Sequence, residues 1–337
     1  MATRQSVIII LMVLFCVTFI TTSTSAAPIV IKWGDSTPKS FSYWPAMQAF
    51  KNEVEQKTGG KVEFQLFGDG VLGDQKTLTE STIMGSIQMS CLPSLVTQNI
   101  VPEHQVLALP FLWRSGQIFK DFLFSSEGKR LGDLFEKHGL KLVTWSYMGP
   151  TGVQNSKREI RSPADLKGLK IRVLPNPVMV DTFNAIGCMA VAMGTAEIYS
   201  ALQQGVIDGI ASAPQFLYSM KIYELAKFYT HLNIQSAAAV VVINLKFWNS
   251  LSPDIQKAFM EASGTWNKVQ EAYFLDSSKE TSEERIMELF KKQGIKITEP
   301  DIETFRKVTK PVVQKYREKI GAESVDRVLK FAGYKLE

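Results

Sequence analysis

The chain contains few of the residues from which metal sites and disulfide scaffolds are built. Its 337 residues include 3 His and 3 Cys, which leaves little material for zinc sites or for a network of disulfides. The serine-hydrolase motif G-x-S-x-G and the zinc-protease motif H-E-x-x-H are both absent. The sequence therefore gives no positive sign of an enzyme, and we expect neither a metal ion nor another cofactor.

Charge and composition narrow the possibilities further. The chain has 38 Lys and Arg against 33 Asp and Glu, a net charge of +5, which is small for its length and does not support nucleic-acid binding. Hydrophobic residues make up 45% and charged residues 21%, the composition of a folded rather than a disordered chain. The length is about twice that of a usual domain, so we expect two domains.

The first 26 residues are predicted to be removed. Arg4 precedes an apolar run of 14 residues, 7–20, and small residues then lead to Ala26, a pattern typical of a secretory signal peptide. As a helix the run would span about 21 Å, short of the roughly 30 Å hydrocarbon core of a membrane. No later stretch approaches 18 apolar residues without charge. We therefore expect export to the periplasm and cleavage after Ala26.

The order of predicted elements indicates an α/β protein. A strand at 29–33, a helix at 43–57 and an alternating strand at 61–67 are followed by a helix near 74–84 and a strand near 86–92. This β-α-β-α-β order predicts a parallel sheet covered by helices. The pattern restarts downstream with strands at 140–145 and 168–173 and a helix that Asn176 caps. A helical pattern from 252 to 292 is long enough to bridge two lobes.

A glycine-rich motif and the three histidines could indicate a cofactor site or catalysis, but both have structural interpretations. Residues 68–73 fit the dinucleotide fingerprint G-x-G-x-x-G, but the acidic residue needed about 20 positions later is missing. We interpret the segment as a glycine-lined turn between a strand and a helix. The three histidines, His104, His138 and His231, are expected at the surface or at helix ends.

One arginine stands apart from the other charged residues. Arg172 lies in the strand-like segment 169–173, where alternation places Ile171 and Val173 on one face and Arg172 on the other. In a cleft, its guanidinium would offer a planar fork for a carboxylate; a surface salt bridge is equally compatible with the residues alone. Several aromatic residues also fall near the ends of predicted strands, where open α/β sheets bind ligands, although each could instead belong to the core. They include Phe41, Trp145 and Tyr147.

Several segments resemble the solute-binding proteins of TRAP transporters, the DctP family. They are Asn-Ser-Lys-Arg-Glu-Ile at 155–160, Ser-Pro-Ala-Asp-Leu-Lys-Gly-Leu-Lys-Ile-Arg-Val at 162–173, and residues 196–209, 72–73 and 109–112. The resemblance implies a two-lobed periplasmic-binding-protein fold. Each lobe would be a mixed sheet flanked by helices, with a long helix spanning both. It also implies capture of a small organic acid in the cleft and delivery to the small and large membrane subunits of a TRAP permease. We expect the protein to act as a monomer.

The resemblance also divides the chain and suggests a site. Lobe I would comprise 27–149 and 238–277, and lobe II 150–237 and 278–337. Cys91 and Cys188 would then lie in different lobes, as two buried thiols rather than a disulfide. The family's carboxylate-binding arginine falls on Arg172. The other expected ligand-binding residues are Ser212, Thr195, Trp145, Tyr147, Asn155, Phe41 and Phe216.

The sequence departs from many relatives in ways that affect the ligand. Residues 149–154 lack the second arginine that these relatives carry, so a monocarboxylate or a sulfonate with an apolar or aromatic body fits better than a dicarboxylate. Two alternatives remain open from the residues. One is the binding component of an ABC importer or of a sensor, and the other is a periplasmic enzyme that acts on organic acids.

Overall fold

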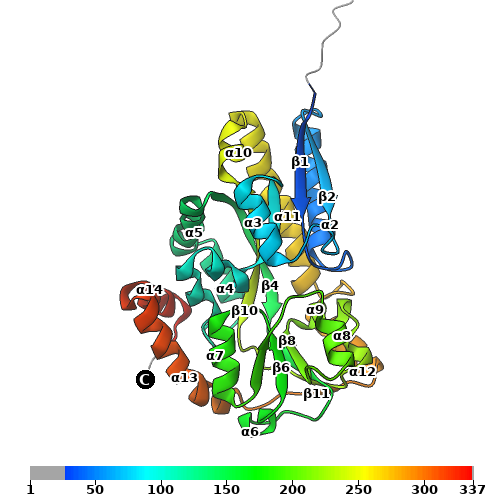
Figure 1. Cartoon of the computed structure of the whole chain (residues 1–337), viewed down its shortest axis with the longest axis vertical. Helices are drawn as coiled ribbons and strands as arrows, with labels where there is room; N and C mark the ends of the chain where they lie inside the picture. The colour runs from blue at the N-terminus through cyan, green and yellow to red at the C-terminus, as the bar shows by residue number, and fades with distance from the viewer. Residues whose placement is uncertain (1–26, 336–337) are drawn as a thin grey trace, which may run out of the picture.

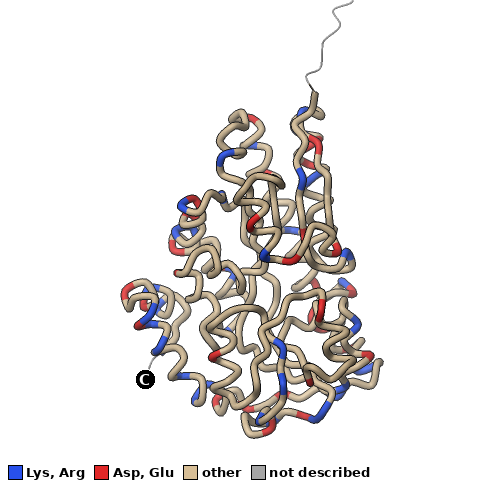
Figure 2. The backbone as a smooth tube through the Cα atoms, in the orientation of Figure 1, with Lys and Arg blue, Asp and Glu red and all other residues tan. Residues whose placement is uncertain are grey.

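Two β-sheets organise the chain, one above the other in Figure 1. The computed structural model describes residues 27–335, so the predicted signal peptide lies outside the described residues. Within that range, no helix combines the length and the apolar character that crossing a membrane requires. Acidic and basic residues are mixed over both parts of the molecule, in keeping with the small net charge (Figure 2).

The first sheet has the strand order β2-β1-β3-β10-β4, and we call the body around it lobe I. Strand β1 runs parallel to β2 and β3, as the sequence predicted, while β10 runs antiparallel to β3 and β4. Trp33 of β1 stacks on Trp266 at 5.5 Å, which fixes α11 over the sheet. The strands are β1 (Ile29–Gly34), β2 (Val62–Phe67), β3 (Met89–Pro93), β4 (Leu140–Pro150) and β10 (Ser236–Asn244). Its helices are α2 (Tyr43–Lys57), α3 (Gln75–Met84), α4 (Gly116–Leu123), α5 (Ser126–Asp133), α10 (Leu245–Ser250) and α11 (Pro253–Leu275), with short 3-10 helices η1 (Ser94–Asn99), η2 (Pro102–Ala108) and η3 (Leu134–His138).

The second sheet has the order β11-β9-β5-β8-β6-β7, and we call the body around it lobe II. Strand β6 is parallel to β7 and β8, while β5 is antiparallel to β8 and β9. The strands are β5 (Gly152–Asn155), β6 (Lys170–Val173), β7 (Met189–Ala192), β8 (Gly209–Ser212), β9 (Phe228–Thr230) and β11 (Lys296–Thr298). Its helices are α6 (Pro163–Leu166), α7 (Pro177–Ile186), α8 (Ile198–Gln203), α9 (Pro214–Ser219), η4 (Ile222–Glu224) and α12 (Glu283–Lys292). Both lobes are thus mixed sheets flanked by helices, which confirms the predicted fold class.

Two strand connections cross side by side between the lobes. The link from β4 to β5 meets the link from β9 to β10, because the amide of Thr151 donates to Gln235 O at 2.7 Å and that of Ile234 donates to Thr151 O at 3.1 Å. A third crossing follows α11. The helical pattern expected over 252–292 forms two helices, α11 and α12, separated between Leu275 and Glu283. Polar side chains between the two helices accept hydrogen bonds from backbone amides of this segment. The Asp276 carboxylate accepts from the amide of Ser278, and the Ser282 hydroxyl caps the start of α12.

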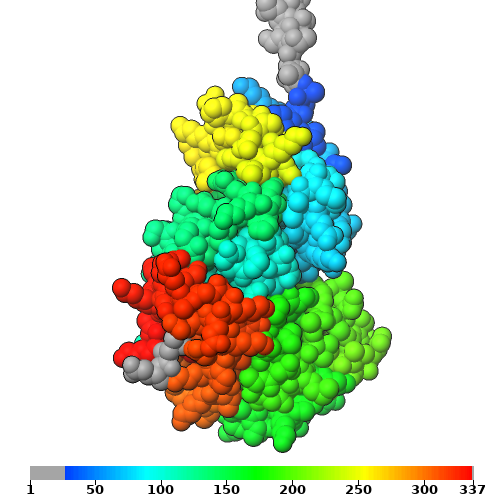
Figure 3. All heavy atoms as spheres, turned by 60° about the vertical axis from the view of Figure 1, so that its left-hand side comes forward, coloured from blue at the N-terminus to red at the C-terminus, as the bar shows by residue number. Residues whose placement is uncertain are grey.

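The C-terminal helices connect the two lobes. Helix α13 (Ile302–Ile320) packs on α7 of lobe II, and α14 (Ala322–Ala332) packs on α4 and η2 of lobe I. Figure 3 shows this red segment lying against the green part of lobe I. The ring of Phe331 meets that of Phe122 edge-on at 5.3 Å. Although the sequence assigned residues 278–337 to lobe II, α14 therefore contacts lobe I.

Candidate functional site

The cleft lies where the carboxyl ends of parallel strands from the two lobes meet, the usual ligand position in open α/β sheets. A cavity of about 370 Å³ has residues from both lobes in its wall, and a second of about 670 Å³ lies beside α3 and η1, with Pro175 and Gly194 of lobe II. The residues around the first are Ser36, Pro38, Asp69, Gly70, Gly73 and Asp74 from lobe I, and Thr195, Ala196 and Met220 from lobe II.

Arg172 occupies the third position of β6 and is 1% exposed. Its strand neighbours Ile171 and Val173 are fully buried on the other face, as alternation predicted. The Nε of Arg172 donates to Met193 O at 2.9 Å, whereas Nη2 is buried without a partner. Desolvation lowers the pKa of Arg172 from 12.5 to about 9. A buried cation is costly unless an anion and further hydrogen bonds compensate it, so this side chain is suited to receive a carboxylate.

Ser212 shares a face of the sheet with Arg172. Strand pairing places Arg172 beside Ile210 of β8, and Ser212 follows two residues later on the same face. Its side chain is half-buried at the carboxyl end of β8. The position is compatible with the ligand contact that the sequence suggested.

Thr195 lies at the cleft, but its side chain already has a protein partner. The hydroxyl accepts a hydrogen bond from Gln75 Nε2 at 2.8 Å, and both side chains are buried. Thr195 follows β7 in lobe II, and Gln75 is the first residue of α3 in lobe I. This pair therefore joins the lobes at the edge of the first cavity.

Asn155 is placed away from Arg172. It pairs with Gly209 at the opposite end of β8, on the face that carries Ile171. Its Oδ1 accepts from the amides of Lys157 and Arg158, and its Nδ2 donates to Arg158 O, all at 2.9 Å. The side chain organises a turn, and we leave it out of the candidate site.

Two of the predicted aromatic residues meet between the lobes. Phe41 contacts Phe216 edge-on with 5.6 Å between ring centroids, and both rings are buried. Tyr273 and Phe274 at the end of α11 also pack on Phe41. This cluster lies near the third crossing between the lobes and joins three elements there.

The other two predicted aromatic residues belong to β4 of lobe I, and one of them reaches the aromatic cluster between the lobes. Strand β4 continues to Pro150, so Trp145 and Tyr147 are inside the strand rather than after it. Trp145 packs on Phe135 and His104, and the Tyr147 ring packs on Gly116, where a Cβ atom would lie 2.6 Å from it. The Tyr147 ring also meets Phe274 of that cluster edge-on, with 6.2 Å between ring centroids.

His104 corrects a further expectation. It is buried rather than at the surface, and its ring nitrogens lie 2.9 Å from Thr97 Oγ1 and from Leu131 O. Burial lowers its pKa from 6.5 to about 4. His104 lies in the 3-10 helix η2, and its ring reaches Leu131 O of α5 in the core of lobe I.

Asp35 is a cleft-side group that the sequence analysis did not select. It follows β1, is 1% exposed, and accepts from the amide and the hydroxyl of Thr37 at 3.1 and 2.5 Å. Desolvation raises its pKa from 3.8 to about 7, and nearby Asp69 adds to the shift. The only signal in the sequence was its position in a turn directly after a predicted strand.

Known proteins share this two-lobed architecture and its sequence pattern. A family model described as bacterial extracellular solute-binding protein, family 7, matches residues 33–319. The chain belongs to the DctP family. Because family members and the named relatives are substrate-binding proteins of transporters, this DctP protein is a solute-binding protein and not an enzyme. Within residues 27–335, no group of three or more His, Cys, Asp and Glu residues is arranged to hold a metal ion.

Individual relatives agree with this assignment. A solute-binding protein of Verminephrobacter eiseniae is 30% identical over 250 residues, which cover 74% of this chain and 75% of the relative. A TRAP periplasmic solute-binding protein from Bordetella bronchispeptica, with density interpreted as pantoate, is 28% identical, covers 89% of this chain and 98% of its own, and has a TM-score of 0.84. The sugar acid binding protein of Advenella mimigardefordensis in complex with galactonate is 27% identical, with coverage of 92% and 99% and a TM-score of 0.86.

Proposed function

We propose that this DctP-family protein captures a small monocarboxylic acid between its lobes, with the carboxylate held by Arg172. The observation that carries the proposal is the buried guanidinium, whose Nη2 has no partner in the protein. A carboxylate can accept two parallel hydrogen bonds from arginine, and each bond to a charged group contributes about 1.5–3 kcal/mol. The ligand would then compensate a charge that the fold leaves uncompensated.

The lining of the cleft supports a hydroxylated acid. Ser36, Asp69 and Asp74 bring polar groups to the first cavity, and Ser212 shares the face of Arg172. Trp145, on which the expectation of an aromatic ligand body partly rested, packs instead on His104 and Phe135 in the core of lobe I. The pantoate and galactonate of the two solved relatives each carry one carboxylate and at least two hydroxyls, which supports the same class for this chain.

We further propose that the protein acts in the periplasm, after removal of residues 1–26, and delivers the acid as a monomer to the small and large membrane subunits of a TRAP permease. The family match supports this partner. Proteoliposomes with these subunits test it: uptake should require the binding protein and an ion gradient. Uptake that instead requires ATP hydrolysis would favour an ABC importer.

The site itself is tested by replacing Arg172 with alanine. A thermal-shift screen of organic acids that includes pantoate and galactonate identifies a ligand, and calorimetry then measures its affinity. We expect Arg172→Ala to weaken binding at least 100-fold, since two charge-assisted hydrogen bonds are lost.

Arg158→Ala is the matched control. It removes the same charge from an exposed side chain that donates to Asp165 O and Lys167 O, remote from the cleft. Binding by this variant should stay near that of the parent. Unchanged affinity in Arg172→Ala would refute the site.

A further inference from the structure

Two sets of hydrogen bonds cross the cleft, one after β6, the strand that carries Arg172, and one after its neighbour β7. After β7, Gln75 donates to Thr195. After β6, Asn176 Nδ2 donates to Leu95 O at 2.6 Å and to Gln98 Oε1 at 3.0 Å. All these partners on the lobe I side belong to α3 and η1. The cleft is therefore joined by protein groups at the ends of two neighbouring strands.

We propose that Asn176 is a positioning residue that holds the end of β6, and with it Arg172, against lobe I when the cleft closes. This inference rests on the proposed function, because it concerns how the binding arginine is presented. Asn176 lies four residues after Arg172 and is 1% exposed. Since it is buried, water cannot readily replace a lost partner, and an unpaired amide there carries a desolvation cost.

The oxygen and the nitrogen of the Asn176 side-chain amide bind different lobes. Its Oδ1 accepts from the amide of Met179 at 3.0 Å and caps α7, while its Nδ2 makes the two bonds to lobe I. One side chain thus ties together the end of β6, the start of α7 and η1 of the other lobe. Gln98 reinforces the link, because its Nε2 donates to Pro175 O at 3.2 Å.

Asn244 offers a natural comparison within lobe I. Its Oδ1 accepts from the amide of Phe247 and caps α10, and its Nδ2 donates to Thr82 O and Ile83 O at 3.0 Å each. The geometry repeats that of Asn176, but every partner belongs to lobe I. The two asparagines therefore separate the effect of a bridge between lobes from the effect of a capped helix.

Asn176→Asp and Asn244→Asp form the test. Aspartate caps a helix as well as asparagine does, so both helices are retained. It cannot donate, however, and a carboxylate would face Leu95 O and Gln98 Oε1. Closure is measured as the distance between spin labels on Lys167→Cys in lobe II and Lys246→Cys in lobe I, both exposed positions. The native thiols Cys91 and Cys188 are buried and should remain unlabelled.

The distances are recorded for the ligand-free chain and with pantoate and galactonate as probes. In the parent we expect a population with a short distance. Asn176→Asp should reduce the ratio of short to long distances at least tenfold, because two buried hydrogen bonds are replaced by repulsion. Asn244→Asp should leave the distribution as in the parent.

Three outcomes would overturn the proposal. The first is an Asn176→Asp distribution equal to that of the parent. The second is an equal shift in both variants, which would indicate a general effect of the buried carboxylate. The third is a parent that shows only the long distance with and without both acids. Arg172→Ala in the labelled chain separates this test from that of the ligand site, because normal binding by that variant refutes the site and leaves the distance comparison intact.

Discussion

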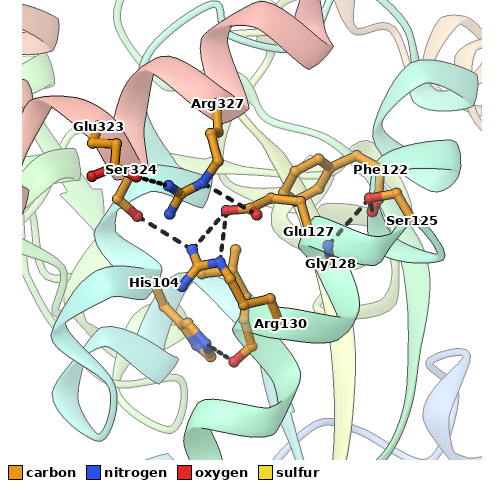
Figure 4. A network of polar contacts seen from close by, with 10 residues as sticks. His104, Phe122, Ser125, Glu127, Gly128, Arg130, Glu323, Ser324 and Arg327 are labelled. Carbon is orange, nitrogen blue, oxygen red and sulfur yellow. Dashed lines mark hydrogen bonds and ion pairs between the residues drawn. The ribbon is translucent and has the colours of Figure 1, made fainter.

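Lobe I meets lobe II at the cleft through neutral amides and hydroxyls, whereas the C-terminal helix α14 is fixed to lobe I by charged groups and aromatic rings. In Figure 4, Glu127 of α5 accepts from Arg130 at 2.6 and 3.0 Å and pairs with Arg327 of α14 at 3.5 Å. Arg130 also donates to Ser324 at 3.2 Å. We call these residues, together with Phe122 and Phe331, the clasp.

The difference indicates which contacts are suited to break during ligand exchange. A neutral hydrogen bond contributes only about 0.5–1.5 kcal/mol net, because water replaces it when it opens. The clasp combines several charged hydrogen bonds with an aromatic pair, so separating it costs more. At the other end of the helix pair, Lys315 and Tyr316 of α13 bind Asp181 of α7 at 2.7 Å each. We infer that the C-terminal helices stay attached while the cleft opens.

Lowering the pH should produce the largest change in the free energy of unfolding, through protonation of His104 beside the clasp. His104 is buried beneath α5, and its folded-state pKa of about 4 lies below the unfolded 6.5. Its contribution to stability is therefore complete above pH 6.5 and is lost as the pH falls toward 4. The difference corresponds to about 3 kcal/mol. We expect His104→Gln to be less stable at pH 7 but to lose less stability between pH 6.5 and 4 in urea unfolding.

Asp35 on the cleft side serves as the opposite control. Its folded-state pKa of about 7 exceeds the unfolded 3.8, so its contribution is complete below pH 3.8 and is lost as the pH rises through 7. Asp35→Asn should remove the decrease in unfolding free energy as the pH rises through 7, and it should leave the decrease in acid due to His104 unchanged. Equal acid slopes in the parent and in His104→Gln would show that the buried imidazole does not control the acid response.

The clasp itself should give the next largest effect. Glu127→Gln removes a charge that two arginines share, and we expect about 1–2 kcal/mol less free energy of unfolding at pH 7, with unchanged ligand affinity. Burial alone would raise the pKa of Glu127, but hydrogen bonding and charge from Arg130 and Arg327 lower it, so the group is ionised at this pH. Urea unfolding and calorimetry measure the two quantities.

A matched control for this change is Glu323→Gln. Glu323 pairs with the same Arg327, but its side chain is 92% exposed, against 14% for Glu127. The control should change stability by less than about 0.5 kcal/mol. Equal losses of unfolding free energy in the two variants, or weaker ligand binding in Glu127→Gln, would contradict the inference that the clasp stays closed while the cleft opens.

Local patterns in the sequence predicted the parallel strands and the orientation of Arg172, because both follow from short-range rules. Alternation in β6 set the face of the arginine, and the β-α-β-α-β order set the parallel strands of lobe I. Trp145 was misplaced because every residue of β4 from Val143 onward is buried, so no alternation marks the end of the strand, which runs five residues further than expected. Asn176 was recognised as a cap, but its partners in η1 lie 78 and 81 residues away, beyond any local pattern.

The smallest expected effect comes from the second bond across the cleft. Thr195→Val keeps the shape of the side chain and removes the hydroxyl that accepts from Gln75. Because one neutral hydrogen bond between the lobes is lost, affinity for the identified acid should fall by about three- to tenfold. In the absence of ligand, Thr195→Val should lower the free energy of unfolding by less than Glu127→Gln does. Gln75→Ala combined with Thr195→Val should then weaken binding no more than the stronger single change, since both remove one bond. Additive losses would instead mean that Thr195 contacts the ligand directly, as the sequence first suggested.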